Sequence, residues 1–470
     1  NNTVGGAMTV TNAGTFTTGN AANLTVGNDF IQNGAGANVI GADLTSTNDG
    51  FNFLRAVTLT STDAIQITMT DGAAGDDLVF QNTLTGTDDN LAINAGANGD
   101  ITFTGAVNLG TGTLTIDNAA IVEVSSTLAA AAFTQTAGTT STTIDNTATI
   151  TNAFTFTGQD LTLSGANNTV GTTMTVTNAG TFTTGDAANL TVGNEFVQNG
   201  AGNSVIGDDL TSTNDGFSFA TNVTLTSTDA LTIQTGEAAG DDVVITGTLT
   251  ETNNPNLTID AGEFGNITLT GAVNLGTGTL TIRDAAIVQV TSTLAAQAFT
   301  QTDGTTSTTI GNTATIAGAF TFTGNALTLS GAGNTVGTTM TVTNAGAFTT
   351  GDAANLTVGT EFVQNGAGNS VIGDDLTSTA DGFAFATNVT LTSGDALTIQ
   401  TGEGTGDDLV ITGTLTETNN PNLTIDAGAA GNITFTGAVD LGTGTLTIRD
   451  AAIVEVSNTF AAGAFTQTDG

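Results

Sequence analysis

The sequence contains no cysteine, histidine, lysine, tryptophan or tyrosine, and phenylalanine is its only aromatic residue. Without cysteine there is no disulfide framework, no cysteine-based zinc site and no thiol nucleophile. A nucleophilic triad also needs a base, and without histidine or lysine only carboxylates with shifted pKa values could move a proton near neutral pH. We therefore expect that the chain is not an enzyme.

Positive charge is almost absent as well: Arg55, Arg283 and Arg449 face 43 acidic residues, and the formal net charge is −40. Such a chain repels phosphate backbones and anionic membranes, so no nucleic-acid partner is expected. No apolar run approaches the roughly 18 residues of a membrane-spanning helix, so no transmembrane helix is expected either. The absence of lysine leaves trypsin-like proteases only three arginines to cleave after, which suits an exposed extracellular protein.

Short alternating segments occupy almost the whole chain, and residues 319–359 are typical. Apolar residues such as Phe320, Phe322, Met340 and Val342 alternate with threonine for three to five positions, and then Gly, Asn or Asp intervenes. This pattern predicts short strands with one buried face, joined at corners by residues that tolerate positive φ. Because no segment carries apolar residues at helical spacing with caps, the expected fold is all-β.

A long repeat runs through the chain. NNTVGGAMTVTNAGTFTTG at Asn1 returns as NNTVGTTMTVTNAGTFTTG at Asn167 and as GNTVGTTMTVTNAGAFTTG at Gly333. The repeat units are 1–166, 167–332 and the incomplete 333–470, and we expect them to form one continuous solenoid. Both ends fall at interior phases of the repeat, so we also expect the chain to be a window from a longer, uncapped array.

The first copy differs in length from the others at two places. It has one extra residue near Thr70 to Gly75 and one fewer near Thr87 to Asn90. A one-residue slip inside a strand would turn its buried face outward. Both places are therefore predicted to be loops.

A shorter apolar period lies inside each repeat. Its members follow one another at nearly even intervals: Leu257, Leu280, Phe299, Phe320, Met340, Phe362 and Phe383. Intervals of roughly 20 residues are typical of one coil of a parallel β-helix. With the right-handed crossover that parallel strands prefer, we predict a right-handed parallel β-helix with about eight coils per repeat. A string of antiparallel sandwiches is the alternative, and the even spacing argues against it.

Several runs resemble the β-strand repeat regions of filamentous-haemagglutinin-like adhesins and autotransporter passenger domains. They include GAVNLGTGTLTI at Gly271, AFTQTDGTTSTTI at Ala298 and the opening stretch, and the similarity extends over essentially the whole chain. The resemblance implies a secreted right-handed β-helix on a bacterial surface, used for adhesion, matrix or filament building. It also implies that copies of the chain associate end to end or laterally into filaments, and that the chain contacts cell-surface glycans.

Acidic residues recur at one phase on successive predicted coils. The two rows are Asp186, Asp208, Asp229 and Glu251 in the second copy, and Asp352, Asp374, Asp395 and Glu417 in the third. Carboxylates stacked about 5 Å apart repel one another, and a divalent cation with oxygen ligands would offset this, so these residues are candidate Ca²⁺ ligands. The alternative is a solvated acidic edge; the first copy has Asn20, Ala42, Asp63 and Gly86 in these places. No other cofactor is expected.

The function expected from these features is structural: a repeat segment of a long extracellular fibre or adhesin stalk. A glycan-binding or glycan-cleaving β-helix is the main alternative, because a glycan hydrolase needs only two carboxylates across a groove. The absence of tyrosine and tryptophan, the usual sugar-stacking residues, counts against it. A third possibility is an ice-binding threonine ladder, but threonine is also the best polar strand former and is spread over nearly all predicted strands.

Overall fold

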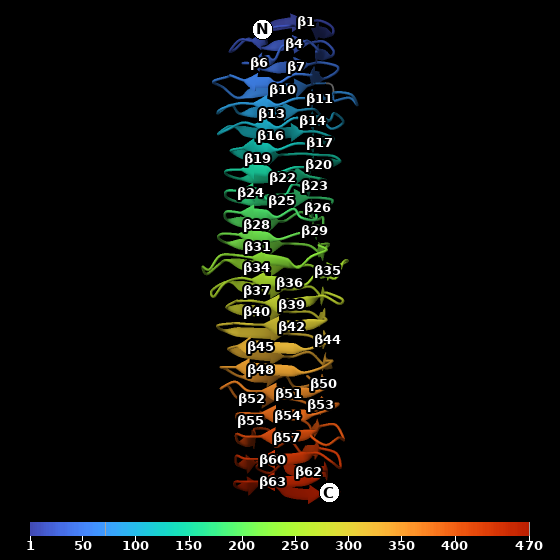
Figure 1. Cartoon of the computed structure of the whole chain (residues 1–470), viewed down its shortest axis with the longest axis vertical. Coiled ribbons are helices and arrows are strands. Elements are labelled where there is room, and N and C mark those ends of the chain that lie inside the picture. The colour runs from blue at the N-terminus through green and yellow to red at the C-terminus, as the bar shows by residue number, and fades with distance from the viewer. Residues whose placement is uncertain (71, 470) are drawn as a thin grey trace. The chain divides into compact units, whose positions relative to one another are not determined.

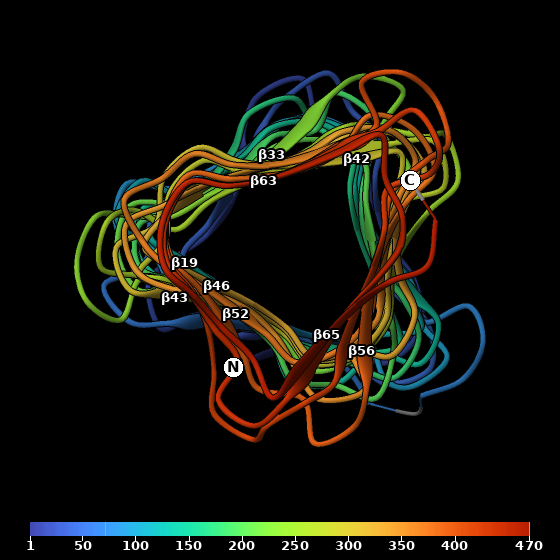
Figure 2. The ribbon, with the colours of Figure 1, turned by 90° about the horizontal axis from the view of Figure 1, so that it is seen from below.

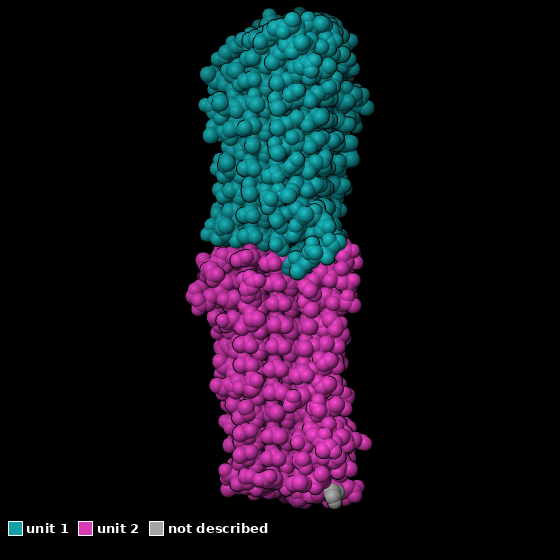
Figure 3. All heavy atoms as spheres, viewed as in Figure 1, with its two compact units in different colours: residues 1–231 teal, residues 232–470 magenta. Residues whose placement is uncertain are grey.

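The computed structural model describes residues 1–70 and 72–469, and every regular element in them is a β-strand. None of these residues forms a helix that could cross a membrane. The chain divides into two compact units, residues 1–231 and 232–470, coloured teal and magenta in Figure 3. The repeat boundaries after positions 166 and 332 fall inside these units, and strand pairing continues across both boundaries.

Each unit is a parallel β-helix with three strands per coil. In unit 1, β1 (Asn2–Val4) pairs in parallel with β4 (Leu24–Val26), and β4 pairs with β7 (Leu44–Ser46), so every strand meets the third strand after it. The coils therefore stack as three parallel sheets around a three-sided core, as Figures 1 and 2 show. The predicted all-β parallel β-helix is confirmed.

One sheet of each unit serves as a reference for the sites described below. In unit 1 it continues with β10 (Ile65–Met69), β13 (Leu91–Asn94), β16 (Thr113–Asn118), β19 (Ala132–Gln135), β22 (Phe154–Gly158), β25 (Met174–Asn178), β28 (Glu195–Gln198) and β31 (Gly216–Phe219). In unit 2 it comprises β36 (Leu257–Asp260), β39 (Thr279–Ile282), β42 (Ala298–Gln301), β45 (Phe320–Gly324), β48 (Met340–Asn344), β51 (Glu361–Gln364), β54 (Gly382–Phe385), β57 (Asp408–Ile411), β60 (Asn432–Phe435) and β63 (Ile453–Val456).

The seven apolar residues of the short period form one internal column of unit 2. Leu257, Leu280, Phe299, Phe320, Met340, Phe362 and Phe383 are partners in register from β36 to β54. Each is at most 2% exposed. Their neighbours in sequence alternate as predicted: Phe322 and Val342 are buried, whereas Thr323 is exposed.

The winding is right-handed, as predicted. Figure 2 views unit 2 with its last coil nearest the reader, and the chain passes from β63 at the top, around the left side, to β65 (Ala464–Gln467) at the lower right. That anticlockwise advance toward the viewer is the right-handed sense, which parallel crossovers favour.

A repeat does not contain a whole number of coils. In unit 1, β1 pairs with β4, whereas its copy β24 (Asn168–Val170) lies in another sheet, between β21 (Ala148–Ile150) and β27 (Leu190–Val192). In unit 2, β36 and its copy β59 (Leu423–Asp426) likewise lie in different sheets. The copies are 23 strands apart, which at three strands per coil is seven and two-thirds coils. The predicted number of about eight coils is confirmed. Each copy, however, begins one-third of a turn before the position at which the preceding copy began.

The two places where the first copy changes length are loops, as predicted. Thr70 and residues 72–75 lie between β10 and β11 (Leu78–Phe80), and residue 71 lies outside the described residues. Residues 87–90 lie between β12 (Leu84–Thr85) and β13. The inserted and deleted residues therefore leave the strand register unchanged.

Candidate functional site

The acidic row of the second copy reaches one corner of unit 1 with three of its members. Asp186, Asp208 and Asp229 follow β26 (Phe182–Thr184), β29 (Ser204–Ile206) and β32 (Val223–Leu225), which pair in succession. Thr228 Oγ1 donates to Asp186 Oδ2 at 3.2 Å across two coils. The backbone N–H of Asp209 donates to Asp208 Oδ1 at 2.8 Å.

The electrostatic consequence is clearest at Asp208. Burial raises the pKa of its carboxyl above the usual value, and repulsion from Asp209, Asp186 and Asp229 raises it further. The hydrogen bond from the Asp209 N–H acts in the opposite direction. The corner is therefore a place where negative charge is costly.

The row of the third copy lies wholly in unit 2. Asp352, Asp374, Asp395 and Glu417 lie at the ends of β49 (Phe348–Thr350), β52 (Ser370–Ile372), β55 (Val389–Leu391) and β58 (Leu415–Glu417). These strands are neighbours in register through Phe348, Ser370, Val389 and Leu415. The acidic residues follow these register partners in the sequence by four, four, six and two positions, respectively. They therefore lie near the same corner of the β-helix but not at equivalent positions on successive coils.

Local turns use several of these carboxylates. Asp374 Oδ1 accepts the Asp375 N–H at 2.8 Å, and the Glu417 carboxylate accepts the N–H of Asn420, which has φ of 54°. Glu251 accepts the N–H of Asn254 in the same way. Among the described residues, no three acidic side chains are grouped so that they could hold a metal ion. Calcium binding at these eight residues stays a prediction.

The arginines do not gather into an anion site. Arg283 Nη1 lies 3.1 Å from Asp260, and Arg449 Nη1 lies 3.4 Å from Asp426, each pair linking adjacent coils of unit 2. In unit 1, Arg55 Nε donates to the carbonyl of Gly34 at 3.1 Å. Each guanidinium is thus engaged locally.

Threonine columns lie on all three sheets rather than on one. In unit 2, one column contains Thr258, Thr281, Thr300, Thr321 and Thr341, a second contains Thr309, Thr328 and Thr349, and a third contains Thr315, Thr335, Thr357 and Thr377. Columns of outward side chains are visible on the surface of the magenta unit in Figure 3. An ice-binding surface would need one flat face, and this distribution does not favour it.

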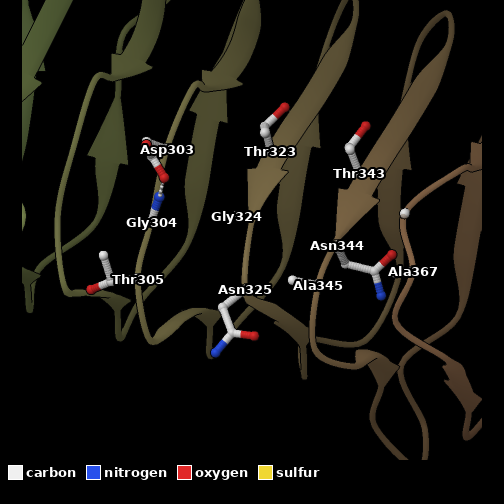
Figure 4. Close-up of a pocket in the computed structure, with 11 residues that line it drawn as sticks. Asp303, Gly304, Thr305, Thr323, Gly324, Asn325, Thr343, Asn344, Ala345 and Ala367 are labelled. Carbon is white, nitrogen blue, oxygen red and sulfur yellow. Dashed lines mark hydrogen bonds between the residues drawn. The ribbon is translucent and has the colours of Figure 1, made fainter.

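Each unit carries a trough that sequence reasoning missed. In unit 2 it has a volume of about 460 Å³ and crosses the corner after β42, β45, β48 and β51; Figure 4 shows its lining. In unit 1 a trough of about 400 Å³ follows β19, β22, β25 and β28. Ten lining positions of one trough are the repeat equivalents of ten in the other, so the hollow is a feature of the repeat.

Small residues make the trough, and neighbouring side chains leave no room for a Cβ at some of these positions. A Cβ on Gly324 would lie 2.9 Å from the ring of Phe322, and a Cβ on Gly304 would lie 2.3 Å from Gln301 Nε2. The exposed methyl groups of Ala345 and Ala367 continue the floor. Glycines at corresponding corners of successive coils were the available sequence signal, but glycine is so frequent at corners that it did not stand out.

The floor of the trough is held from inside by buried amides. In unit 1, Gln198 Nε2 donates to the carbonyls of Gly200 and Gly202 at 3.1 and 2.8 Å and to Asn178 Oδ1 at 2.8 Å. Gln364 and Asn344 repeat this arrangement in unit 2. Buried amides that pair with otherwise unsatisfied carbonyls fix the corner in one conformation.

The sequence matches no protein-family model, and no curated protein or solved structure matches the chain. The resemblance to bacterial adhesin repeats therefore stays an expectation drawn from the residues.

Proposed function

We propose that this protein is a structural repeat segment of a long secreted fibre or adhesin stalk on a bacterial surface. The observation that supports this most directly is the offset of one-third of a turn per repeat. Together with the strand pairing that crosses both repeat boundaries, this offset means that successive copies continue one winding and do not form separate closed modules. Further copies would lengthen such a fibre without creating an enclosed site.

The charge of the chain fits an exposed fibre. A net charge of −40 keeps separate fibres apart at low salt and lets them associate laterally when cations screen it. The extracellular bacterial location rests on the resemblance and on the absence of lysine. Self-association end to end or side by side is part of this proposal.

Electron microscopy of the native material tests the proposal. Seven and two-thirds coils of about 4.8 Å predict an axial repeat of about 37 Å, with the same face returning after three repeats. Gold-labelled antibodies against the chain should decorate intact cells. Compact, discrete particles, or labelling that requires permeabilised cells, would overturn it.

A further inference from the structure

We propose that the trough of each unit binds a short stretch of a neutral polysaccharide. The fibre proposal needs no ligand, so this inference goes beyond it and stands or fails separately. Four observations carry it: the repetition of the trough, the low charge of its lining, the spacing of its hydroxyls and its rigid floor.

The trough repeats together with its chemistry. The lining of unit 1 includes Thr157, Thr177, Asn178 and Ala179, and unit 2 has Thr323, Thr343, Asn344 and Ala345 in the same places. Each trough spans a repeat boundary: the trough of unit 1 joins the first and second copies, that of unit 2 joins the second and third, and both are open to solvent. Because the sequence repeats, the same hollow is expected at each repeat boundary of a longer fibre.

The lining carries little charge on a chain that is otherwise strongly acidic. None of the residues that line the unit 1 trough is charged. The unit 2 trough has one carboxylate, Asp303, whose Oδ1 accepts the N–H of Gly304 at 2.7 Å. The surrounding negative charge would repel a polysaccharide that carries uronate, sulfate or phosphate groups. A neutral, hydroxyl-rich chain fits both the lining and its surroundings.

The hydroxyls are spaced and oriented for such a chain. Thr157 pairs with Thr177 in register, and Thr323 pairs with Thr343, so their side chains repeat at the coil spacing. Figure 4 shows Thr323 and Thr343 pointing the same way from adjacent strands. Four coils about 4.8 Å apart span about 14 Å, which accommodates about three pyranose units of an extended glycan.

The proton on one hydroxyl of each pair is already committed. Thr177 Oγ1 donates to Asn199 Oδ1 at 2.6 Å, and Thr343 Oγ1 donates to Asn365 Oδ1 at 2.6 Å. The remaining lone pairs of each oxygen accept hydrogen bonds, so these sites select ligands that bring O–H donors. The glycine and alanine floor lets a sugar ring approach closely without an aromatic platform.

The rigid floor reduces the cost of binding. Because Gln198 and Gln364 hold the carbonyls of the corner from inside, little conformational entropy is lost when a ligand is bound. A second copy of the chain is the competing occupant. At low salt its net charge of −40 opposes close contact between the troughs of two chains, so we assign the trough under these conditions to a glycan.

Affinity electrophoresis of the full chain tests the assignment. The gels contain soluble neutral glucan, galactan or mannan, with polygalacturonate as the acidic comparison. The test variant carries Ala179→Gln and Ala345→Gln, which place a bulky neutral side chain in each trough. The control carries Ala166→Gln and Ala332→Gln, at exposed positions one per unit and outside both troughs.

Retention of the wild type by at least one neutral polysaccharide, weakened about tenfold in the trough variant and unchanged in the control, would support the assignment. Circular dichroism checks that both variants keep the β-helix. No retention by any neutral polysaccharide, equal retention of both variants, or stronger retention by polygalacturonate would overturn it. So would sedimentation data showing that the trough variant abolishes self-association, because the trough would then be a contact between fibres.

Discussion

The ring of Phe320 lies on the ring of Phe299, one coil earlier, with centroids 4.6 Å apart and planes inclined by 24°. Both rings are 1% exposed, and the column continues to Met340 and Phe362 on the next two coils. Side chains that pack across adjacent coils in this way help to hold together a stack in which each coil contacts only its neighbours. The column therefore gives the first prediction.

Phe320→Ala should destabilise unit 2 by about 3–5 kcal/mol, because it removes a buried ring and leaves a cavity. The loss should stay local, so hydrogen exchange should rise in the coils around β45 and little elsewhere. Phe264→Ala is the control, since Phe264 is 55% exposed. A similar loss from both variants, or uniform exchange along the unit, would contradict the column.

The column could be predicted from the sequence because apolar residues that alternate with threonine mark the inward positions of each strand. The number of coils per repeat could not be predicted to within one-third of a coil. Corners vary in length: the partner of Val57 on the next coil is Leu84, whereas Leu280 reaches its partner Phe299 over a much shorter stretch of chain. Dividing the length of the repeat by that of an average coil therefore cannot distinguish seven and two-thirds coils from eight.

Polar residues that point into the core were a second feature that the alternation of apolar and polar residues did not predict. Gln198 and Asn178 occupy inward positions at strand ends and are at most 1% exposed. A binary apolar and polar pattern assigns such residues to the surface. These polar side chains are buried because they bond to backbone carbonyls at the corner, and that arrangement of carbonyls exists only in the folded chain. The trough, which depends on that corner, was missed for the same reason.

Glycines at corners give the second prediction. A Cβ on Gly368 would lie 1.5 Å from the carbonyl oxygen of Gly346 on the preceding coil, whereas a Cβ on Gly394 has nothing within 4 Å. Gly368→Ala should therefore lower stability by about 1–3 kcal/mol or more, because backbone must move. Gly394→Ala should be neutral or stabilise by up to about 1 kcal/mol through the unfolded state. Equal urea midpoints for the two variants would be inconsistent with the close approach of the coils.

Register gives the third prediction, and the absence of cysteine makes it simple to test. Thr321 and Thr341 are partners in register on adjacent strands, and both point outward. Thr321→Cys with Thr341→Cys should form an intramolecular disulfide, because parallel neighbours at about 4.8 Å lie within disulfide range. Thr321→Cys with Thr349→Cys places the second thiol on another sheet and should not. Mass spectrometry with and without reductant distinguishes the two; crosslinking in the second pair alone would reject the coil assignment.

The raised pKa of the Asp208 carboxyl gives the fourth prediction. Its folded pKa lies above the unfolded value because of burial and neighbouring carboxylates, so the folded state binds the proton more tightly. Stability from this group is therefore present at low pH and is lost as the pH rises through the folded pKa. Asp208→Asn should raise Tm at pH 7 and flatten the decline in Tm between acidic and neutral pH. The gain should be below about 1 kcal/mol, since solvent screens a partly exposed group.

Asp145→Asn is the matched control for this experiment. Asp145 is exposed and lies three coils before Asp208 in the stack of unit 1. Removing any one of the 43 acidic residues relieves some general repulsion, and the control measures that part. If the two variants shift Tm equally at every pH, the corner has no electrostatic role of its own.

The acidic rows give the last prediction, which concerns calcium. Any salt should raise Tm by screening a net charge of −40, so calcium must be compared with magnesium and with sodium chloride of equal ionic strength. If the rows bind calcium, an additional calcium-specific rise should appear, and Asp208→Asn should reduce it more than Asp145→Asn. The local hydrogen bonds of Asp186, Asp208 and Glu417 compete with coordination, so the effect should saturate only at high calcium concentrations. Identical responses to calcium and magnesium, or to calcium in both variants, would leave the rows as solvated acidic edges that separate neighbouring fibres.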